Sequence, residues 1–554
     1  MPQPLKKIAR RSLLKFGTLE AVTGVGSFFL GAGVARAAEA MPPASSLNEI
    51  LYRLAVPEIF QALPTAPSHS QALVIGTGFG AAVSALRLGQ AGVQVTMLER
   101  GSRWPRDLWR QIFSSESLID GRSVWFRTSF PGFDGIVRPV DSFGGVLDVT
   151  EYEHIKVWRG AAVGGGSVVF TGAMVQPERR FFDHVFQGVV SYEEMDRVYY
   201  PLARRMLGVS PMPTDVYQSA PFGHSRVWDA HASQAGYTPQ RIDSIFQWDI
   251  VRRELAGTAR PSAILGESTF GNANGAKYDL GQNYLPQAEA TGKVTIHSGH
   301  QVTAIGREAD GRYWVQVNVV APNGTVLRQR TLTADSLFLG AGSIGTSELL
   351  VAARDTGALP NLDETIGTGW GTNGDAAVAR VFSGLEGFNQ GSPCASRILD
   401  ESRMPVTMEN WYVPNLPVNP GLIGTLGMAL DSHRASFRYD STRKKVVLEW
   451  PSQGNDDVVS ALRTVNNRIA DASGTQVGVP GLIPDVNATF TAHPLGGVVL
   501  GRSTDAYGRV KGYDHLYVVD GAAVPGSTGT VNPSLTITAL AERSIAEIIR
   551  AGGI

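Results

Sequence analysis

The segment from Gln71 to Gly101 limits what this 554-residue chain can fold into more than any other segment does. It reads QALVIGTGFGAAVSALRLGQAGVQVTMLERG: an apolar run, a glycine turn, an amphipathic stretch and a second apolar run. The first run has no polar alternation, which is typical of a parallel strand buried on both faces. The amphipathic stretch predicts a helix from Ala81 to Gln90 that ends before Gly92. The segment therefore predicts the opening βαβ unit of an α/β fold.

The turn inside this unit has the spacing of a dinucleotide-binding loop. Gly76 permits a tight turn, Gly78 lets backbone approach a pyrophosphate, and the small Ala81 lets the helix pack on the strand. The pyrophosphate would lie at the helix N-terminus, where free amides and the helix dipole favour negative charge. Glu99 ends the second strand at the distance expected of an acid that binds the ribose hydroxyls, which argues against NADP. The predicted contacts in this half are Gly76, Gly78, Phe79, Gly80 and Glu99.

The C-terminal region favours FAD over NAD. Residues 516–526 read LYVVDGAAVPG, placing Asp520 and Gly521 after an apolar strand, and they resemble the second flavin-binding segment of large flavoproteins. Asn532 is predicted to cap a helix whose first residue is Pro533. The positive end of that helix would stabilise the negative charge that reduced flavin carries at N1 and the C2 carbonyl. An ordinary C-terminal helix with a good cap is the alternative.

A third glycine cluster lies between these two regions. Residues 160–167 read GAAVGGGS, and three consecutive glycines are not expected in a regular element. Apolar residues flank the cluster on both sides, so backbone pressed against a flat ligand is favoured over a disordered linker. The predicted cofactor contacts in this cluster are Gly164, Gly165, Gly166 and Ser167.

The first 37 residues differ in charge from the rest of the chain. They hold six Lys or Arg and one Glu, so residues 38–554 carry 43 basic and 49 acidic residues, a net charge of −6. This balance disfavours a polyanion-binding role, and no nucleic-acid partner is expected. We expect no metal site either.

Residues 1–37 have the pattern of a twin-arginine signal peptide. Arg10-Arg11 precedes an apolar stretch from Ala21 to Ala35 and a small-residue cleavage site at Ala35-Arg36-Ala37, with a second option at Ala38-Glu39-Ala40. An uncleaved membrane anchor is the alternative. The single cysteine, Cys394, cannot form an internal disulfide, which fits export of an already folded protein. We expect the mature protein to be secreted or periplasmic.

A chain of this length is expected to form more than one domain. We predict a Rossmann-like FAD-binding domain interrupted by an α+β substrate-binding domain, after a lead-in segment at 38–70. The FAD-binding domain is assigned to 71–107, 143–180, 271–365 and 491–554, and the substrate-binding domain to 108–142, 181–270 and 366–490.

Several motifs in order resemble the glucose–methanol–choline oxidoreductase family, and within it the bacterial cholesterol oxidases with non-covalent FAD. The resemblance runs from about Gln71 to Arg550, through the segments described above and through FGNANGAKYDLGQNYL, LFLGAGSIGTSELLVAARDTGALPNL and HPLGG. No histidine precedes the GGGS cluster where covalently flavinylated relatives place one, so non-covalent FAD is expected. The resemblance also implies Val302 as a cofactor contact.

The resemblance implies three catalytic residues. His493, in the HPLGG motif, would bind the substrate hydroxyl and assist its deprotonation, and Asn532 would interact with the reduced flavin ring. Glu409 would move the proton in isomerisation of the Δ5-3-ketone to the Δ4-3-ketone, because a carboxylate in an apolar pocket has a raised pKa. Asp400 and Glu401 are nearby alternatives to Glu409.

The chain also departs from the family pattern. Phe170 stands where the family has an asparagine, Ser534 replaces a phenylalanine, Thr530 is one inserted residue, and Val498 replaces a cysteine. Phe490 matches an aromatic residue that packs near the flavin ring. The first three departures bear on substrate preference and on oxygen reactivity.

The resemblance implies an oxidase for a 3β-hydroxysteroid such as cholesterol, with molecular oxygen as acceptor, transient membrane contact for sterol uptake and a monomeric state. One alternative is a dehydrogenase of the same family that oxidises another alcohol and passes electrons to a quinone or cytochrome. A flavin- or sterol-binding protein without turnover is a further alternative.

Overall fold

The computed structural model describes residues 38–131, 136–381, 390–413, 421–478 and 485–554, so the predicted signal peptide lies outside the described residues. Among these residues no helix combines the length and apolar character needed to cross a membrane. The helices are α1 Leu47–Ala55, α2 Phe79–Gln90, α3 Arg179–Phe186, α4 Tyr192–Glu194, α5 Tyr200–Leu207, α6 Thr214–Tyr217, α7 Gly223–Gln234, α8 Trp248–Leu255, α9 Tyr284–Ala290, α10 Gly342–Asp355, α11 Asp456–Ser473 and α12 Ser534–Arg550.

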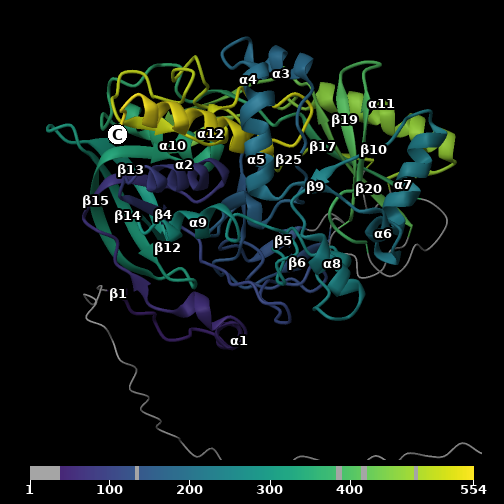
Figure 1. Cartoon of the computed structure of the whole chain (residues 1–554), viewed down its shortest axis with the longest axis horizontal. Helices are drawn as coiled ribbons and strands as arrows, with labels where there is room; N and C mark the ends of the chain where they lie inside the picture. Colours follow the sequence, from purple (N-terminus) through teal and green to yellow (C-terminus); the bar gives the residue numbers. More distant parts are fainter. Residues whose placement is uncertain (1–37, 132–135, 382–389, 414–420, 479–484) are drawn as a thin grey trace, which may run out of the picture. The chain divides into compact units, whose positions relative to one another are not determined.

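The first large sheet contains the predicted βαβ unit. Its strand order is β12-β4-β3-β15-β14-β13, with β26 also pairing with β15 (Figure 1). Neighbouring pairs among β12, β4, β3, β15 and β26 are parallel, whereas β13, β14 and β15 form an antiparallel meander. The strands are β3 His69–Ile75, β4 Val95–Glu99, β12 Val294–Ser298, β13 His300–Arg307, β14 Tyr313–Val320, β15 Val326–Leu339 and β26 Leu516–Val518.

The predicted strand–turn–helix–strand order is confirmed, but helix α2 begins earlier than predicted. It starts at Phe79 rather than Ala81, because Gly78 already has the extended backbone of an N-cap. Gly80 lies inside the first turn, and a Cβ on it would stand 1.6 Å from the Val519 carbonyl oxygen. The helix therefore packs directly against the chain that follows β26.

The second large sheet is antiparallel and has the order β10-β18-β19-β20-β17-β23, with β24 also pairing with β17. Helices α7 and α11 pack against it (Figure 1). The strands are β10 Gln240–Arg241, β17 Asp375–Val381, β18 Ser396–Asp400, β19 Val406–Trp411, β20 Leu422–Ala429, β23 Gln476–Val477 and β24 Val486–Asn487.

The other described strands form smaller, separate sheets. One pairs β25 Phe490–Thr491 with β8 Lys156–Gly160 and β7 Leu147–Glu151, and another pairs β16 Thr368–Trp370 with β21 Ala435–Asp440 and β22 Lys445–Glu449. The two-stranded pairs are β1 Ala38–Glu39 with β2 Leu63–Pro64, β5 Ser129–Pro131 with β6 Val137–Pro139, and β9 Ser210–Pro211 with β11 Asp243–Ser244. The architecture is a mixed α/β fold; the predicted domain boundaries stay a prediction.

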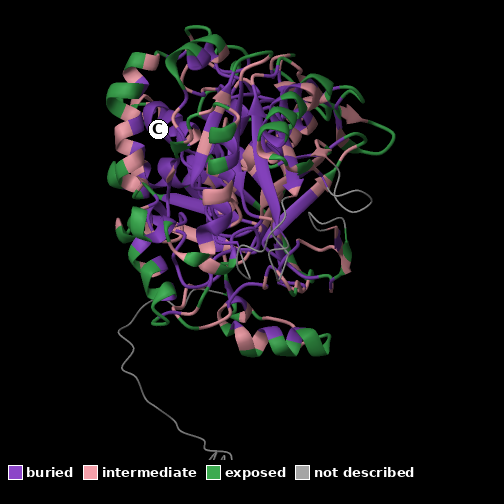
Figure 2. Ribbon diagram, turned by 90° about the vertical axis from the view of Figure 1, so that its right-hand side faces the viewer, coloured by how far each residue is buried: buried purple, intermediate pink, exposed green. Residues whose placement is uncertain are grey.

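The strands of both large sheets are mostly buried, and the exposed residues lie mainly on the outer helices and loops (Figure 2). One apolar core joins the first sheet to α2 and α12, and a separate core lies between the second sheet and α7 and α11. Further apolar clusters lie outside these two, so the hydrophobic core is divided into several parts.

Candidate active site

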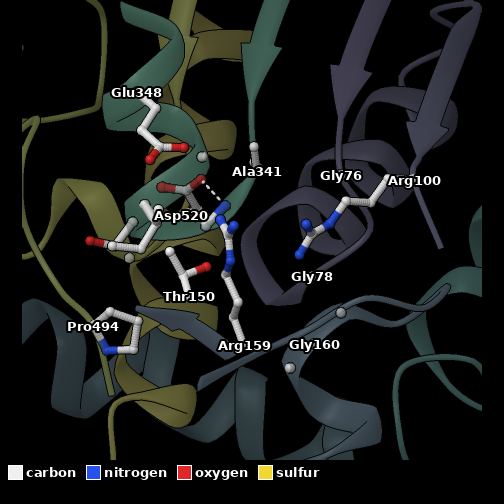
Figure 3. A pocket seen from close by; sticks show the side chains of 18 of the residues that line it. Gly76, Gly78, Arg100, Thr150, Arg159, Gly160, Ala341, Glu348, Pro494 and Asp520 are labelled. Carbon is white, nitrogen blue, oxygen red and sulfur yellow. Dashed lines mark hydrogen bonds between the residues drawn. The ribbon is translucent and has the colours of Figure 1, made fainter. Parts of the chain in front are cut away.

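A cavity of about 870 Å³ is lined by both large sheets. The N-terminal ends of three helices, α2, α10 and α12, reach its wall. Free backbone amides and the helix dipoles make this wall favourable for negative charge. Figure 3 shows Gly76 and Gly78 on one side of the cavity and Asp520 and Pro494 on another.

The first glycine turn is packed so tightly that its backbone forms the cavity surface. Gly76 has φ +93°, and a Cβ there would stand 2.2 Å from the Gly340 carbonyl oxygen. A Cβ on Gly78 would have no protein atom within 4 Å of it, so this side of the turn is open to a ligand. Phe79 and Gly80 also line the cavity. These four residues lie where the sequence predicts dinucleotide contacts.

Glu99 lies at the end of β4 and lines the same cavity. One carboxylate oxygen accepts a hydrogen bond from the Thr77 hydroxyl at 2.7 Å, and the other accepts one from the Gly101 amide at 2.9 Å. Burial raises the pKa of Glu99 above its ordinary value. The carboxylate is thus held at the ligand-facing end of the strand, as predicted.

The residues of the third glycine cluster have two different roles. Gly165 and Gly166 line the cavity, and a Cβ on Gly165 would lie 2.7 Å from the Gly78 Cα, so the two glycine loops touch. Gly164 and Ser167 do not line it: Gly164 donates its amide to Thr77, and the Ser167 hydroxyl donates to the Gly164 carbonyl at 2.7 Å. These two residues hold the loop, and their prediction as cofactor contacts is not supported by the geometry.

The expectation of no regular element in this cluster was wrong. Residues Gly165–Val168 form one 3-10 turn. Left-handed backbone at Gly164 (φ +107°) and Gly165 (φ +54°) lets the chain enter that turn after β8.

Asp520, Gly521 and Val302 also line the cavity. Asp520 joins two segments, since its carboxylate accepts hydrogen bonds from the Gly342 amide at 2.8 Å and from the Thr346 hydroxyl at 2.6 Å. Burial raises its pKa to about 6. The second flavin-type segment is therefore tied to the N-terminus of α10.

Two arginines in the cavity wall were not predicted. Arg100 and Arg159 both contact Asp148, at 2.8 Å and 3.0 Å, and the Arg159 side chain points from its strand into the cavity (Figure 3). Glu348 lies on the neighbouring wall and accepts a hydrogen bond from the Tyr152 hydroxyl at 2.9 Å. The only sequence signal was basic residues beside two predicted glycine motifs, WRG and ERG.

The three predicted catalytic residues lie together at the other end of the cavity. Glu409 on β19 is fully buried and accepts a hydrogen bond from the Asn532 side-chain amide at 3.2 Å. Burial raises the pKa of Glu409 to about 7, and the Asn532 hydrogen bond and His493 oppose part of that rise. His493 and Asn532 both line the cavity.

Asp375, at the start of β17, completes this cluster and was not predicted. Its carboxylate lies 2.8 Å from His493 Nδ1 and is fully buried. Burial opposes protonation of His493, but Asp375 and then Glu409 outweigh it and raise the pKa of the imidazole. A glycine turn ending in an acid, GTNGD at 371–375, was the available sequence signal.

The prediction that Asn532 caps the C-terminal helix was wrong. Helix α12 begins at Ser534, and the Pro533 carbonyl accepts the first helical hydrogen bond, from Ile537 at 2.8 Å. The Asn532 side chain is instead directed to Glu409. Proline fits this position because its nitrogen has no hydrogen to leave unpaired.

The two alternative acids lie elsewhere. Asp400 binds Arg468 at 2.7 Å and Glu401 binds Arg180 at 2.7 Å. Glu409 does not line the cavity either, but it accepts a hydrogen bond from Asn532, which does, so the geometry favours Glu409 over these two acids.

Three of the departures and the matched aromatic can be placed. Phe170, Ser534 and Phe490 line the cavity, and Phe170 packs edge-on against Phe79 with ring centroids 5.6 Å apart. Thr530 has φ +66° and its hydroxyl accepts a hydrogen bond from Thr407 at 3.2 Å, so the inserted residue is accommodated by a left-handed turn.

The lining fits a flavin dinucleotide. One half offers bare glycine backbone, helix N-termini and the Glu99 carboxylate for a ribose and pyrophosphate. In the other half Asn532 lines the cavity and Glu409 lies behind it, and Glu409 Oε1 and Asn532 Oδ1 are buried without a hydrogen-bond partner within the described part of the chain. Such atoms are costly unless a bound molecule or water satisfies them.

The family model described as GMC oxidoreductase matches residues 71–353, and its C-terminal counterpart matches residues 437–541. Among curated proteins, a cholesterol oxidase of Mycobacterium tuberculosis (strain ATCC 25618 / H37Rv) is 29% identical over 553 residues, covering 85% of this chain and 90% of the relative. A cholesterol oxidase of Acinetobacter baumannii is 26% identical over 548 residues, covering 86% and 94% respectively.

Solved structures show the same fold. Pyridoxine 4-oxidase from Mesorbium loti superposes with a TM-score of 0.60 at 15% identity, covering 87% of this chain and 99% of that one. A fungal aryl-alcohol oxidase superposes with a TM-score of 0.59 at 13% identity, covering 88% and 100%.

Proposed function

Because the chain belongs to the GMC oxidoreductase family, whose members typically bind FAD, we propose that it oxidises the 3β-hydroxyl of a sterol such as cholesterol. Molecular oxygen is the proposed acceptor and hydrogen peroxide the second product. The observation that carries this proposal is the cluster of His493, Asn532 and the buried Glu409 at one end of the cavity. His493 and Asn532 suit alcohol oxidation, and a buried carboxyl group beside them suits the proton transfer of a sterol isomerisation.

FAD bound in this cavity would supply the acceptor for the hydride of the alcohol carbon. His493 binds the substrate hydroxyl and takes its proton, because its imidazole lines the cavity and has a raised pKa. Asn532 presents its side chain beside the N-terminus of α12, which favours negative charge developing at that end of the cavity.

Glu409 is the proposed base for the second reaction. It removes the C4 proton of the Δ5-3-ketone and returns it at C6, which gives the conjugated Δ4-3-ketone. A carboxyl group whose pKa lies near 7 can both accept and release this proton at neutral pH. The neighbouring Asn532 amide can orient the carboxylate during both steps.

The mature protein is further proposed to be exported through the twin-arginine pathway, to hold FAD without a covalent bond and to contact lipid transiently as a monomer. The leader pattern at 1–37 supports export, and the absence of a histidine from residues 155–167 supports non-covalent binding. Release of the flavin by acid precipitation tests the binding mode.

The deciding experiment is anaerobic mixing of the purified holoprotein with cholesterol, followed by admission of air, with the flavin absorbance recorded throughout. Bleaching by sterol, fast recovery in air and formation of peroxide are expected. Bleaching that air does not reverse would instead support the dehydrogenase alternative. No bleaching by any alcohol would contradict both and favour a binding protein.

His493→Gln tests the assignment within that assay. We expect flavin reduction to slow by roughly 100-fold or more, because a positioned base contributes about 10²–10⁴ in rate. His433→Gln is the matched control, since His433 also binds an aspartate through Nδ1, at 2.9 Å, but does not line the cavity. Equal rates in the two variants would contradict the role of His493.

A further inference from the structure

The cluster around His493 holds two acidic side chains that do not themselves line the cavity, Asp375 and Glu409, and Asp375 is the one within hydrogen-bond distance of the ring. We propose that Asp375 is a positioning residue: it fixes the tautomer and direction of the His493 imidazole, so that Nδ1 carries the proton and Nε2 is the acceptor offered to the substrate. This inference rests on the proposed alcohol oxidation and adds to it the residue that makes the histidine competent.

Within the described residues, the Asp375 side chain accepts its hydrogen bonds from one short segment. Oδ2 accepts from the Thr491 hydroxyl at 2.8 Å, the Ala492 amide at 3.1 Å and the His493 amide at 3.2 Å. Oδ1 lies 2.8 Å from His493 Nδ1. The carboxylate therefore binds the backbone and the ring of the same residue, which leaves the ring little freedom to rotate.

A tightly packed turn and a regular strand hold Asp375 in this position. A glycine turn with Gly374 at φ +70° precedes it, and β17 pairs with β20 in an uninterrupted register from Asp375 to Val381. A Cβ on Gly374 would lie 2.1 Å from the Ala429 carbonyl oxygen, so the turn tolerates only glycine. A side chain on a strand is held more accurately than one on a loop.

The tautomer follows from hydrogen-bond chemistry. A carboxylate only accepts, so the ring nitrogen that faces it must carry a hydrogen. In a neutral imidazole the other nitrogen then has a free lone pair, and that nitrogen is the one able to take a hydroxyl proton. The bound carboxylate also raises the proton affinity of the ring.

The other ionisable groups around this ring are Glu409 on β19 and, beyond it, Arg397 on β18. Glu409 acts on the imidazole in the same direction as Asp375, and burial of the ring acts against both. Arg397 lies opposite Glu409 in the strand register and acts on that carboxyl group. Of the two acids, Asp375 is the one that makes a hydrogen bond to the ring.

Asp375→Asn distinguishes a role in setting the tautomer from a role in packing, because asparagine has the shape of aspartate but not its two accepting oxygens. The amide has one accepting oxygen and one donating nitrogen, whereas the site presents hydrogens to both positions. If the asparagine oxygen still accepts the hydrogen bonds of the Ala492 and His493 amides, the asparagine nitrogen faces Nδ1 and donates to it. Nδ1 must then be the bare nitrogen, so the ring hydrogen lies on Nε2. The histidine then faces the substrate as a donor and cannot take the hydroxyl proton.

The matched control is Asp431→Asn. Asp431 is a second buried aspartate that accepts from the amide of a histidine, His433, at 2.8 Å and from its Nδ1 at 2.9 Å, and it does not line the cavity. Flavin content and thermal unfolding of both holoproteins establish that they are folded before any comparison is made.

The first readout is the rate of anaerobic flavin reduction by cholesterol as a function of pH. In Asp375→Asn we expect the plateau to fall by roughly 100-fold or more, the midpoint of its rise to move to lower pH, and KM to change little. Asp431→Asn should keep both plateau and midpoint. A lower plateau with an unchanged midpoint would overturn the proposal, because a structural role alone predicts that result.

The second readout does not depend on turnover. In holoprotein labelled with ¹⁵N-histidine, the His493 signals are assigned by their loss in His493→Gln. We expect protonated Nδ1 and bare Nε2 in the wild type above the ring pKa, and the reverse in Asp375→Asn. Wild-type protein with bare Nδ1 would overturn the proposal even if the variant failed to fold. If no alcohol reduces the wild-type flavin, the proposed function fails while this measurement still decides the role of Asp375.

Discussion

The two ends of the cavity are lined by different kinds of groups, backbone at one end and side chains at the other. The dinucleotide end is made of glycine backbone and helix N-termini, supplied largely by residues within a single βαβ unit and one loop. The catalytic end is made of side chains from two strands and two loops that are far apart in the chain: Asp375 lies 118 residues from His493, and Glu409 lies 123 residues from Asn532. A site of the first kind depends on close packing of the backbone, whereas one of the second kind depends on the register of distant strands.

The largest contrast is expected between two glycines of the same loop. Gly80→Ala should abolish the folded protein or cost more than about 3 kcal/mol, because its Cβ would stand 1.6 Å from the Val519 carbonyl oxygen. Gly78→Ala should lower the stability of the flavin-free protein by at most about 1 kcal/mol, because nothing lies within 4 Å of its Cβ and only the N-cap preference is lost, while weakening FAD binding at least tenfold.

Thermal unfolding of the flavin-free proteins and fluorescence titration with FAD measure these two effects. If Gly80→Ala unfolds at the wild-type temperature, the packing of α2 against the chain after β26 does tolerate a side chain at residue 80. If Gly78→Ala binds FAD normally, the open face of the loop is not the pyrophosphate site.

An intermediate effect is expected at the catalytic end, where burial of Glu409 should cost stability. Its folded pKa of about 7 exceeds its ordinary value of 4.5, so the folded state holds a proton that the unfolded state has lost between these pH values. Stability from this group is therefore present below about pH 4.5 and is lost as the pH rises to about 7. The free energy of unfolding of Glu409→Gln, relative to that of the wild type, should therefore be about 2 kcal/mol higher at pH 8 than at pH 5.

Urea unfolding of the flavin-free proteins at pH 5 and pH 8 measures this gain. Glu401→Gln is the control, because Glu401 is exposed and paired with Arg180, and its effect should be the same at both pH values. The same stability difference at both pH values for Glu409→Gln would show that this carboxyl group is already ionised in the fold.

The smallest effect is expected at Glu99. Glu99→Gln keeps an oxygen for the Gly101 amide but loses one acceptor, so FAD affinity should fall about tenfold, which corresponds to the loss of one charge-assisted hydrogen bond. Glu254→Gln is the control: Glu254 is a buried carboxylate that accepts from backbone amides and does not line the cavity. Unchanged affinity in Glu99→Gln would remove Glu99 from the ribose site.

The same contrast explains which features the sequence could predict. Residues of the βαβ unit are neighbours in the chain, so spacing alone predicted the strand order, the turn and the placement of Glu99. The helix start was misplaced by two residues because Gly80 looked like part of the turn but lies in the helix. Family resemblance, rather than pattern, located His493, Asn532 and Glu409.

Asp375 and the cavity arginines were beyond sequence reasoning. An acid after a glycine turn is usually a solvated turn residue, and only the pairing of β17 beside β20 and the packing of 490–493 show that this one is buried. Likewise, Asn532-Pro533 has the composition of a helix cap, and only the position of Glu409 shows that the amide is used elsewhere.

The contact of α2 with the C-terminal segment has a consequence for truncated forms of the protein. Gly80 lies against Val519, and Arg87 binds Glu542 through two hydrogen bonds of 2.7 Å, so the glycine loop rests on residues more than 400 positions later in the chain. The loop has earlier partners in Gly165 and Gly340, but its contact with Val519 and the ion pair of α2 with Glu542 need the C-terminal segment. A protein truncated before residue 519 would therefore lack part of the support of its dinucleotide loop.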